Sequence, residues 1–387
     1  MPFTALEDYA RFICRRLRAA GYQAFFVGGC VRDLLLGRRA KDYDVATDAS
    51  PEGVLQLFPE AGVVGAHFGV VLVREDRWQI EVATFRSDAA YSDGRRPDAV
   101  RFVSDPKHDA ERRDFTINAL FLDPETDHVL DFVGGRADLT AGLIRAIGDP
   151  AARFEEDHLR LLRAIRFATR LGFVIEPLTL AAMRRMACLV KLVAVERVRE
   201  ELNRILVEGQ RGVELLHETG LLAEILPEVS YTDEVRLRFQ RAAELSPSLA
   251  WAALLLNAPS AASVAIAKRL RFSISEFDDL SNLLASGVRL REIGMMALAN
   301  KKRLMRDPQF GDYIALQRLC GEPSPVLPRY SDAELHPPRL LTGLDLIDLG
   351  YPQGPLYSKI LSALEDAQLE GLLSNREEAV RWLRSRF

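Results

Sequence analysis

Residues 25–47 read FFVGGCVRDLLLGRRAKDYDVAT, and this stretch decides the fold of the N-terminal part of the chain. An apolar strand runs into Gly28 and Gly29, and a predicted helix that contains Arg32 and Asp33 follows. Glycine lets backbone amides approach an anion, and the start of a helix adds the positive end of its dipole, so such a turn can bind phosphate. An ordinary tight turn has the same sequence, and no GxGxxG pattern indicates a dinucleotide site. From this segment alone, both a phosphate-binding turn and an ordinary tight turn stay possible.

Two acids follow within the same stretch, in KDYDVAT at residues 41–47. Asp42 and Asp44 are two residues apart in a β-prone run, so we expect both carboxylates on one face of a strand. Like charges held together are costly unless a cation compensates them, and Mg²⁺ prefers oxygen ligands. The pair predicts a metal site, with solvated acids on an edge strand as the alternative. Glu81, on a further predicted strand in WQIEVATF at residues 78–85, is expected to complete the site.

The hydrophobic pattern predicts an α/β unit followed by a helical remainder. Residues 6–18 carry apolar side chains at three- and four-residue steps, which indicates an amphipathic helix. Short β-rich runs occupy residues 22–85. From about Ala151 these runs vanish and stretches rich in Leu, Ala, Arg and Glu predict helices, interrupted by a proline-rich linker at 323–338. A length of 387 residues exceeds one ordinary hydrophobic core, so we expect at least two packed units.

Composition limits the possible partners and compartments. Fifty-one Lys and Arg against fifty-five Asp and Glu give a net charge of −4, so only a local basic patch could meet a polyanion. The four cysteines lie far apart without a CxxC pair, which disfavours a zinc site and a disulfide framework. Charged side chains interrupt the first twenty residues, which therefore contain no apolar signal core, and no later stretch approaches the ~18 apolar residues of a membrane span. We therefore expect a cytoplasmic protein without a membrane partner.

A third segment, ERRDFTINALFLD at residues 111–123, holds Arg112, Arg113, Asp114 and Asn118. An arginine fork can hold phosphate through two parallel hydrogen bonds. An Arg with an Asp and an Asn nearby can equally fix a ribose or position a loop. The segment is therefore a candidate nucleotide contact.

A fourth segment, FEEDHLRLLRAIRFATRLGF at residues 154–173, predicts one continuous helix. Asp157, Arg160, Arg163 and Arg166 recur on it at three-residue steps, each of which retreats by roughly 60° around the axis. Asp157 and Arg160 should therefore share a face, with Arg163 at its margin and Arg166 turned away. An Asp beside an Arg offers acceptors and donors that suit the edge of a base. The alternative is an i,i+3 salt bridge on a solvated helix.

Taken in order, VGGCVRD, DYD, RRDFTINA and EDHLRLLRAIRFA closely resemble the class II tRNA nucleotidyltransferase and bacterial poly(A) polymerase family. The resemblance covers at least residues 22–205. It extends to LLTGLDLIDLGYPQGPLYSKIL at 340–361, where Gln353 and Ser358 replace an expected Pro and Gly. It implies an α+β fold whose nucleotidyltransferase palm, of mixed sheet and helices, precedes an all-helical part. The implied regions are a head at 1–145, a neck at 146–207, an RNA-binding body at 208–322, and a linker with a tail at 323–387.

The resemblance also implies an activity, which is template-independent addition of C and A nucleotides, as CCA or as the terminal A, to the 3′ end of tRNA. CTP and ATP are the implied substrates, Mg²⁺ the cofactor, and pyrophosphate the product. The matching positions are Gly28, Gly29 and Arg32 for the phosphate turn, Asp42 and Asp44 for the metal, Glu81 as third acid, Arg113 as nucleotide contact, and Asp157, Arg160, Arg163 and Arg166 for base selection and the triphosphate. Residues 89–102 resemble the family's flexible loop, which implies terminal A addition. Residues 192–206 resemble a helix that follows the base-selecting one.

Two other functions compete with tRNA extension. A poly(A) polymerase would have a nearly identical active site, although no tail rich in Lys or Arg follows the body here. A catalytically inactive RNA-binding module would be expected to lack Asp42 or Asp44, and both are present. The expected contact for a folded RNA duplex is a set of basic residues in the helical part: Lys268, Arg269, Arg271, Arg289, Arg291, Lys301, Lys302, Arg303 and Arg306. Solvated helix faces are the alternative for these residues.

Overall fold

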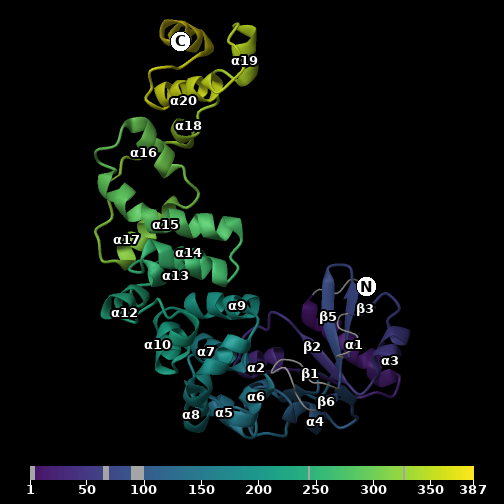
Figure 1. Cartoon of the computed structure of the whole chain (residues 1–387). Coiled ribbons are helices and arrows are strands. Elements are labelled where there is room, and N and C mark those ends of the chain that lie inside the picture. The colour runs from purple at the N-terminus through teal and green to yellow at the C-terminus, as the bar shows by residue number, and fades with distance from the viewer. Residues whose placement is uncertain (1–4, 64–68, 89–99, 243–244, 326) are drawn as a thin grey trace. The chain divides into compact units, whose positions relative to one another are not determined.

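The computed structural model describes residues 5–63, 69–88, 100–242, 245–325 and 327–387 (Figure 1). The chain divides into two compact units. Unit 1 is residues 1–231 with 264–271, and unit 2 is residues 232–263 with 272–387. None of the described helices is long and apolar enough to cross a membrane. The predicted division into four regions remains a prediction.

A seven-stranded mixed sheet forms the centre of unit 1, with the order β3-β4-β5-β2-β1-β8-β9. Only β2 and β5 run parallel; every other neighbouring pair in this sheet is antiparallel. Its strands are β1 (Ala24–Val27), β2 (Asp44–Thr47), β3 (Gly62–Val63), β4 (Val70–Glu75), β5 (Trp78–Thr84), β8 (Leu120–Leu122) and β9 (Val129–Asp131). Two small sheets pair β6 (Arg86–Asp88) with β7 (Val100–Phe102) and β10 (Leu143–Ile144) with β11 (Val174–Ile175).

Helices surround this sheet and continue into the rest of unit 1. They are α1 (Leu6–Ala19), α2 (Gly29–Leu35), α3 (Pro51–Leu57), α4 (Pro106–Glu111), α5 (Gly135–Ala141), α6 (Pro150–Glu156), α7 (Arg160–Leu171), α8 (Pro177–Met186), α9 (Val195–Leu206), α10 (Gln210–Glu218) and α11 (Leu221–Ile225), with short 3-10 helices η2 (Thr116–Asn118) and η3 (Ala187–Leu192). The predicted α+β class with its helical remainder is confirmed.

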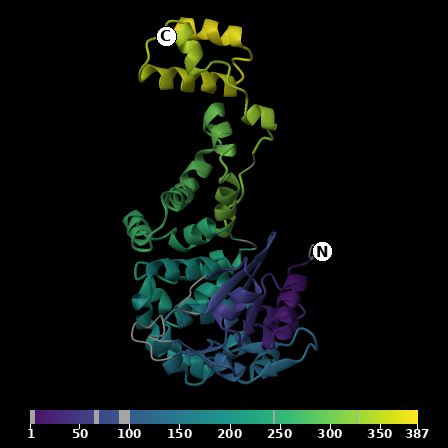
Figure 2. The same ribbon diagram turned by 90° about the vertical axis from the view of Figure 1, so that its right-hand side faces the viewer.

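Helix α1 shows why the sequence folds as it does at the N-terminal end. Tyr9, Ile13 and Leu17 are buried at three- and four-residue spacing. The helix lies against strands β1, β2 and β5 of the sheet (Figure 2). Acidic residues occupy its first turn and basic residues its last, which complements the helix dipole. The helix predicted at 6–18 is therefore confirmed within one residue.

The two faces of the sheet carry different contents because side chains alternate along each strand. On β1, Phe26 contacts Arg11 of α1, whereas Phe25 packs with Phe85 and Phe121 on the opposite face. Asp44 is the register partner of Val27, which lies two residues from Phe25. Its carboxylate therefore projects from the face away from α1.

Unit 2 is entirely helical over its described residues. Its helices are α12 (Asp233–Gln240), α13 (Pro247–Leu255), α15 (Ile274–Glu292), α16 (Leu298–Met305), α17 (Phe310–Leu319), α18 (Asp332–Leu335), α19 (Gly343–Asp348), α20 (Leu356–Leu369) and α21 (Arg376–Arg386), and α14 (Ser260–Arg269) contributes residues to both units. A separate apolar core, which includes Leu346, Ile360 and Leu383, holds α19, α20 and α21 together at the yellow end of the chain (Figure 2).

Three predictions about local structure were wrong. Asp42 does not lie on a strand, because β2 begins at Asp44. Strand β1 ends at Val27, the register partner of Asp44, and Gly28, with φ +76°, turns the chain into α2. The residues before Asp44 therefore have no partner on β1. The predicted all-helical remainder contains the strand β11, which pairs in parallel with β10.

The third error concerns the helix predicted at 154–173, which is interrupted. Asp157 adopts an extended conformation with φ −143° and ψ 103°, so α6 ends at Glu156. The carboxylate of Asp157 accepts a hydrogen bond from the Leu159 amide at 3.1 Å, a local turn that competes with helix continuation. Helix α7 starts afresh at Arg160.

Candidate active site

A polar pocket of about 400 Å³ lies within unit 1, and its described lining contains six arginines and three aspartates. It is lined by Gly28, Gly29, Arg32, Asp44, Arg112, Arg113, Asp114, Asn118, Asp157, Arg160, Arg163, Phe167 and Arg170. Eight of the eleven predicted site residues are among them, and the other three are Asp42, Glu81 and Arg166. Such an excess of guanidinium groups suits an anionic ligand that carries phosphates.

Asp44 and Glu81 face one another across two neighbouring parallel strands, where they are register partners. Burial raises the pKa of Asp44 to about 6, and the negative charge of Glu81 adds to the effect while Arg113 opposes it. The Asp44 carboxylate accepts no hydrogen bond from any residue that the structure describes. Asp44 is half-buried and Glu81 is exposed. A partly buried carboxylate beside a second acid, without donors, is the arrangement that a divalent cation stabilises.

The acids nevertheless do not form a complete metal site. Asp42 is exposed and precedes the strand by two residues. Among the described residues, no group of three or more His, Cys, Asp or Glu is arranged to hold a metal ion. The structure thus supplies a carboxylate pair at Asp44 and Glu81, with Asp42 close along the chain.

The glycine turn adjoins this carboxylate pair. With φ +76°, Gly28 has a backbone conformation that favours glycine. A β-carbon at Gly28 would lie 3.5 Å from Nη1 of Arg113 and 3.8 Å from Oδ2 of Asp44. The backbone of the turn therefore approaches both the Arg113 guanidinium and the Asp44 carboxylate.

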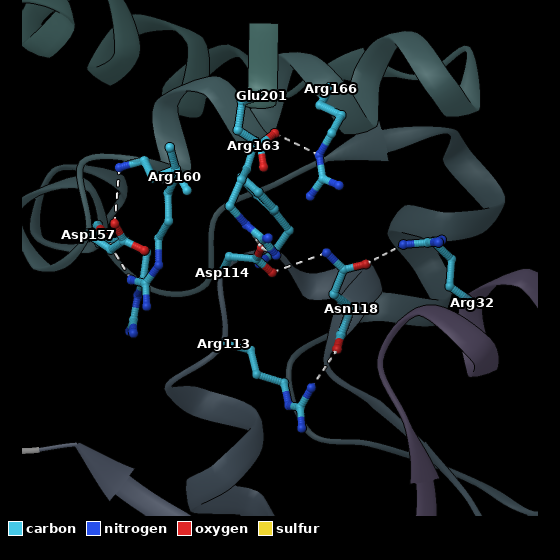
Figure 3. Close-up of polar contacts among 12 residues, drawn as sticks. Arg32, Arg113, Asp114, Asn118, Asp157, Arg160, Arg163, Arg166 and Glu201 are labelled. Atoms are coloured by element: carbon cyan, nitrogen blue, oxygen red, sulfur yellow. Dashed lines mark hydrogen bonds and ion pairs between the residues drawn. The ribbon is translucent and has the colours of Figure 1, made fainter. Parts of the chain in front are cut away.

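The buried carboxylate of Asp114 ties three elements of the pocket together (Figure 3). It accepts hydrogen bonds from Nε and Nη2 of Arg163 on α7, at 2.8 and 2.5 Å, and from Nδ2 of Asn118 on η2, at 3.1 Å. Asn118 in turn accepts from Nη1 of Arg32 on α2, at 2.7 Å. Burial alone would raise the pKa of Asp114, but Arg163 outweighs it, and the pKa falls to about 2.

Arg32 has little donor capacity left for a ligand in this arrangement. Its Nε and Nη2 donate to Oδ1 of Asp33 at 2.9 and 2.7 Å, in addition to the bond to Asn118. The residue is 3% exposed. It fixes the pocket wall, and its predicted contact with phosphate stays a prediction.

Asp157 and Arg160 both reach the pocket, although they do not share a helix. Nη1 of Arg160 donates to Glu156 at 2.6 Å, and Asp157 instead pairs with Arg197 of α9 at 3.5 Å. The i,i+3 salt bridge that was the alternative interpretation does not form. Both side chains lie in a pocket and not on a solvated helix face.

Arg166 does not line the pocket, in agreement with the prediction that it is turned away from Asp157 and Arg160, and it pairs with Glu201 instead (Figure 3). Its Nε lies 2.8 Å from Oε2 of Glu201 on α9, and both side chains are largely buried. Burial lowers the pKa of Arg166 to about 10, although Glu201 opposes the shift. Of the residues predicted to contact the nucleotide, Arg166 is the one outside the described lining of the pocket, so its contact has the least support.

Sequence reasoning missed Phe167 and Arg170, which also line the pocket. They follow Arg163 by four and seven residues, the spacing of a true helical face. The guanidinium carbons of Arg163 and Arg166 lie 5.3 and 4.5 Å from the centre of the Phe167 ring. A search at seven-residue spacing, instead of three, would have found both residues.

The basic residues predicted to meet RNA are largely neutralised within the chain. Five of the nine form ion pairs: Arg269 with Glu228, Arg271 with Glu196, Arg291 with Glu322, and both Arg303 and Arg306 with Glu365. Lys302 is buried beneath the Tyr330 ring. The predicted positive surface of the helical part is therefore weaker than its composition suggests. Most of the predicted loop, residues 89–99, lies outside the described residues.

Comparison with known proteins identifies relatives over nearly the whole chain. The family described as "Poly A polymerase head domain" matches residues 24–145, and "Probable RNA and SrmB- binding site of polymerase A" matches residues 172–232. A CCA-adding enzyme of Limosilactobacillus fermentum is 36% identical over 386 residues, which cover 95% of this chain and 93% of the relative. A CCA-adding enzyme of Enterococcus faecalis is 34% identical over 393 residues, which cover 95% and 93%. The crystal structure of Bacillus stearothermophilus CCA-adding enzyme in complex with CTP is similar with a TM-score of 0.75 and 30% identity, and the match covers 99% of this chain and 98% of that one.

The uncompensated charge at Asp44 predicts that Asp44→Asn stabilises the metal-free protein. The pKa of about 6 in the folded state exceeds the ordinary value of 3.8, so the wild type loses stability as the pH rises from about 4 to 6 and bears the full cost above that range. The difference is worth up to about 3 kcal/mol at pH 8. Chemical denaturation in EDTA at pH 4.5 and pH 8 measures it. A variant that is less stable than the wild type at pH 8 would contradict this account of the charge.

Asp114 should behave in the opposite way. Its lowered pKa contributes stability above about pH 4, and that stability is lost as the pH falls from about 4 to 2. We expect Asp114→Asn to cost roughly 2–3 kcal/mol at pH 7, below the usual cost of breaking a buried pair because Arg163 is 32% exposed. The free energy of unfolding of the variant should also fall less steeply than that of the wild type as the pH is lowered from about 4 to 2. Glu60→Gln, at an exposed residue, is the control, and equal effects of the two changes would refute the role of the pair.

Proposed function

Because this chain belongs to the family of CCA-adding enzymes, we propose that it adds C and A nucleotides to the 3′ end of tRNA, using CTP and ATP without a nucleic-acid template and releasing pyrophosphate. The observation that supports this most strongly is the pocket in unit 1, where the half-buried Asp44 carboxylate adjoins a glycine turn and six arginines. A transferred nucleotide needs a negatively charged triphosphate to be held beside an activated hydroxyl. This pocket offers residues for both tasks.

We propose that Asp42 and Asp44, with Glu81 beside them, hold Mg²⁺. The fit rests on the paired acids, the absence of hydrogen-bond donors to Asp44 among the described residues, and the raised pKa of that carboxyl. Bound Mg²⁺ would lower the pKa of the RNA 3′ hydroxyl and neutralise charge on the triphosphate. Every other task falls to side chains and backbone of the chain itself.

The triphosphate is proposed to bind along the glycine turn and the arginines that face it. The amides of Gly28 and Gly29 are proposed to donate to phosphate oxygens, and Arg113 lies near the same turn. Arg163 already points into the pocket because Asp114 holds its Nε and one Nη. Fixed donors of this kind need no reorganisation when charge develops during transfer.

Asp157 and Arg160 are proposed to read the incoming base. Cytosine and adenine both present an amino donor beside a ring-nitrogen acceptor, whereas guanine and uracil reverse that order. An aspartate acceptor and an arginine donor fixed in one pocket would therefore accept the first pair and reject the second. Their anchoring to Arg197 and Glu156 limits the motion of both side chains.

We also propose that the four regions at 1–145, 146–207, 208–322 and 323–387 act as head, neck, body and tail. A cytoplasmic location is proposed from the tRNA substrate alone. A poly(A) polymerase remains the second candidate, because the matched head family carries that name. Product length separates the two functions.

The products on three tRNA transcripts should be short and defined. With tRNAs that end before the CCA, after C and after CC, we expect at most three added nucleotides, finishing in A, because a rigid acceptor arm leaves the active site no room for more. An unstructured oligo(A) primer at equal concentration should be extended poorly. Sequencing gels with CTP, ATP or both give the result. Long heterogeneous A ladders on the primer, with tRNA no better a substrate, would favour a poly(A) polymerase.

Loss of either metal-site acid should stop addition without unfolding the protein. Asp42→Ala and Asp44→Ala each remove a proposed ligand and not core packing, so the fold and RNA binding should persist. Addition rates in Mg²⁺ and melting curves are compared with Glu60→Ala, at an exposed residue. A variant at Asp42 or Asp44 that keeps more than about a tenth of the wild-type rate would move the metal site elsewhere.

Changes at the base-reading pair should loosen base choice more than they weaken triphosphate binding. In Asp157→Ala and Arg160→Ala, discrimination against GTP and UTP should fall while the KM for CTP changes less, because lost hydrogen bonds to the base discriminate between substrates. Single-nucleotide incorporation with all four triphosphates measures both effects. Unchanged discrimination in both variants would make these residues purely structural.

A further inference from the structure

Three exposed cations precede the Asp44 carboxylate and have no acidic partner among the residues that the structure describes. Arg38, Arg39 and Lys41 lie in the segment that joins α2 to β2 (Figure 1), and all three side chains are exposed. No described residue forms an ion pair with any of them. Asp42 is the one acid of this short segment, which therefore carries a net positive charge.

This lack of partners distinguishes them from the cations of the pocket. Each of the six pocket arginines has an acid within 4.0 Å: Arg32 and Arg170 with Asp33, Arg112 and Arg113 with Asp109, Arg160 with Glu156, and Arg163 with Asp114. When unpaired cations neutralise the phosphates of a polyanion, the counterions condensed along that polyanion are released, which favours binding. The segment is therefore suited to a phosphate backbone.

The segment is held in place even though its charges are exposed. The amide of Arg38 donates to the carbonyl of Asp33 at 2.9 Å, and the Ala40 side chain is buried. At the other end Tyr43 is buried against Phe26, and its hydroxyl donates to Glu7 at 3.0 Å. Anchors on both sides orient the charged residues outward before any ligand arrives.

Position along the chain identifies which reactant they serve. Lys41 is three residues before Asp44, so their Cα atoms are at most about 11 Å apart. None of the three cations lines the nucleotide pocket. The other reactant that must reach Asp44 is the RNA strand that carries the 3′ hydroxyl, and its last phosphodiesters adjoin that hydroxyl.

We infer that Arg38, Arg39 and Lys41 bind the last phosphodiesters of the RNA 3′ strand and position its terminal hydroxyl at Asp44. The inference rests on the proposed function, because it assigns these residues to the RNA substrate of the same site. They are positioning residues: they hold the strand and take no part in bond formation.

The test compares the full chain carrying R38A, R39A and K41A together with a control carrying R15A, R136A and R185A. The control removes three exposed cations, also without ion-pair partners among the described residues, that lie on α1, α5 and α8. The KM for tRNA lacking its CCA end should rise about 10- to 50-fold in the first protein, and the slope of log KM against log salt should fall by about 2. The control should match the wild type, and the KM for CTP should not change in either protein.

A chemical change in the RNA locates the contact. A minihelix with neutral methylphosphonates at its last two 3′ linkages should bind the wild type more weakly than the unmodified minihelix does. The same modification should reduce the affinity of the R38A/R39A/K41A variant much less. If the RNA change weakens binding equally in the wild type and in the triple variant, the inference is overturned. It is also overturned if the variant is defective with tRNA but not with the minihelix, because the cations would then contact another part of the tRNA. If the wild type adds no nucleotide to tRNA, the proposed function fails; if it does and both triple variants behave alike, this inference alone fails.

Discussion

The buried carboxylate of Asp114 is the constraint on which the pocket depends. A charge removed from water must be compensated, and Asp114 obtains its compensation from α7 through Arg163 and from η2 through Asn118. Asn118 then holds Arg32 of α2, so helices far apart in the sequence are joined by one polar chain (Figure 3). Arginines that face the pocket are therefore fixed before a nucleotide enters, which is the condition for electrostatic preorganisation.

The opposite situation holds at the carboxylate pair. Asp44 and Glu81 are brought together by strand register, and no described side chain donates a hydrogen bond to Asp44. Burial and like charge destabilise the ionised form, so the folded protein bears a cost there that a divalent cation would remove. One half of the site is thus balanced internally through Asp114 and Arg163, whereas the charge of Asp44 and Glu81 would be balanced by a bound cation. Function at the cost of stability is common where a site must bind charge.

Local patterns predicted much of the fold and the site. The strands β1, β2, β4 and β5 and the helix α1 follow from hydrophobic periodicity, and the four segments that carry the resemblance contribute most of the pocket. The errors have local causes. Gly28 ends the β1–β2 ladder, which leaves Asp42 outside the strand, and the side chain of Asp157 bonds to the Leu159 amide, which interrupts a helix that periodicity alone would continue. Ion pairs that connect distant residues, such as Arg303 with Glu365, could not be predicted because no local pattern encodes them.

The most direct test of this account is crystallographic. Crystals of the full chain with Mn²⁺ and a non-hydrolysable CTP analogue give an anomalous signal that locates the metal independently of the protein density. The account predicts a peak within coordination distance of the Asp44 carboxylate, the phosphates along the turn at Gly28 and Gly29, and the base against Asp157 and Arg160. A metal peak away from Asp44, or a nucleotide bound outside the arginine-lined pocket, would contradict it.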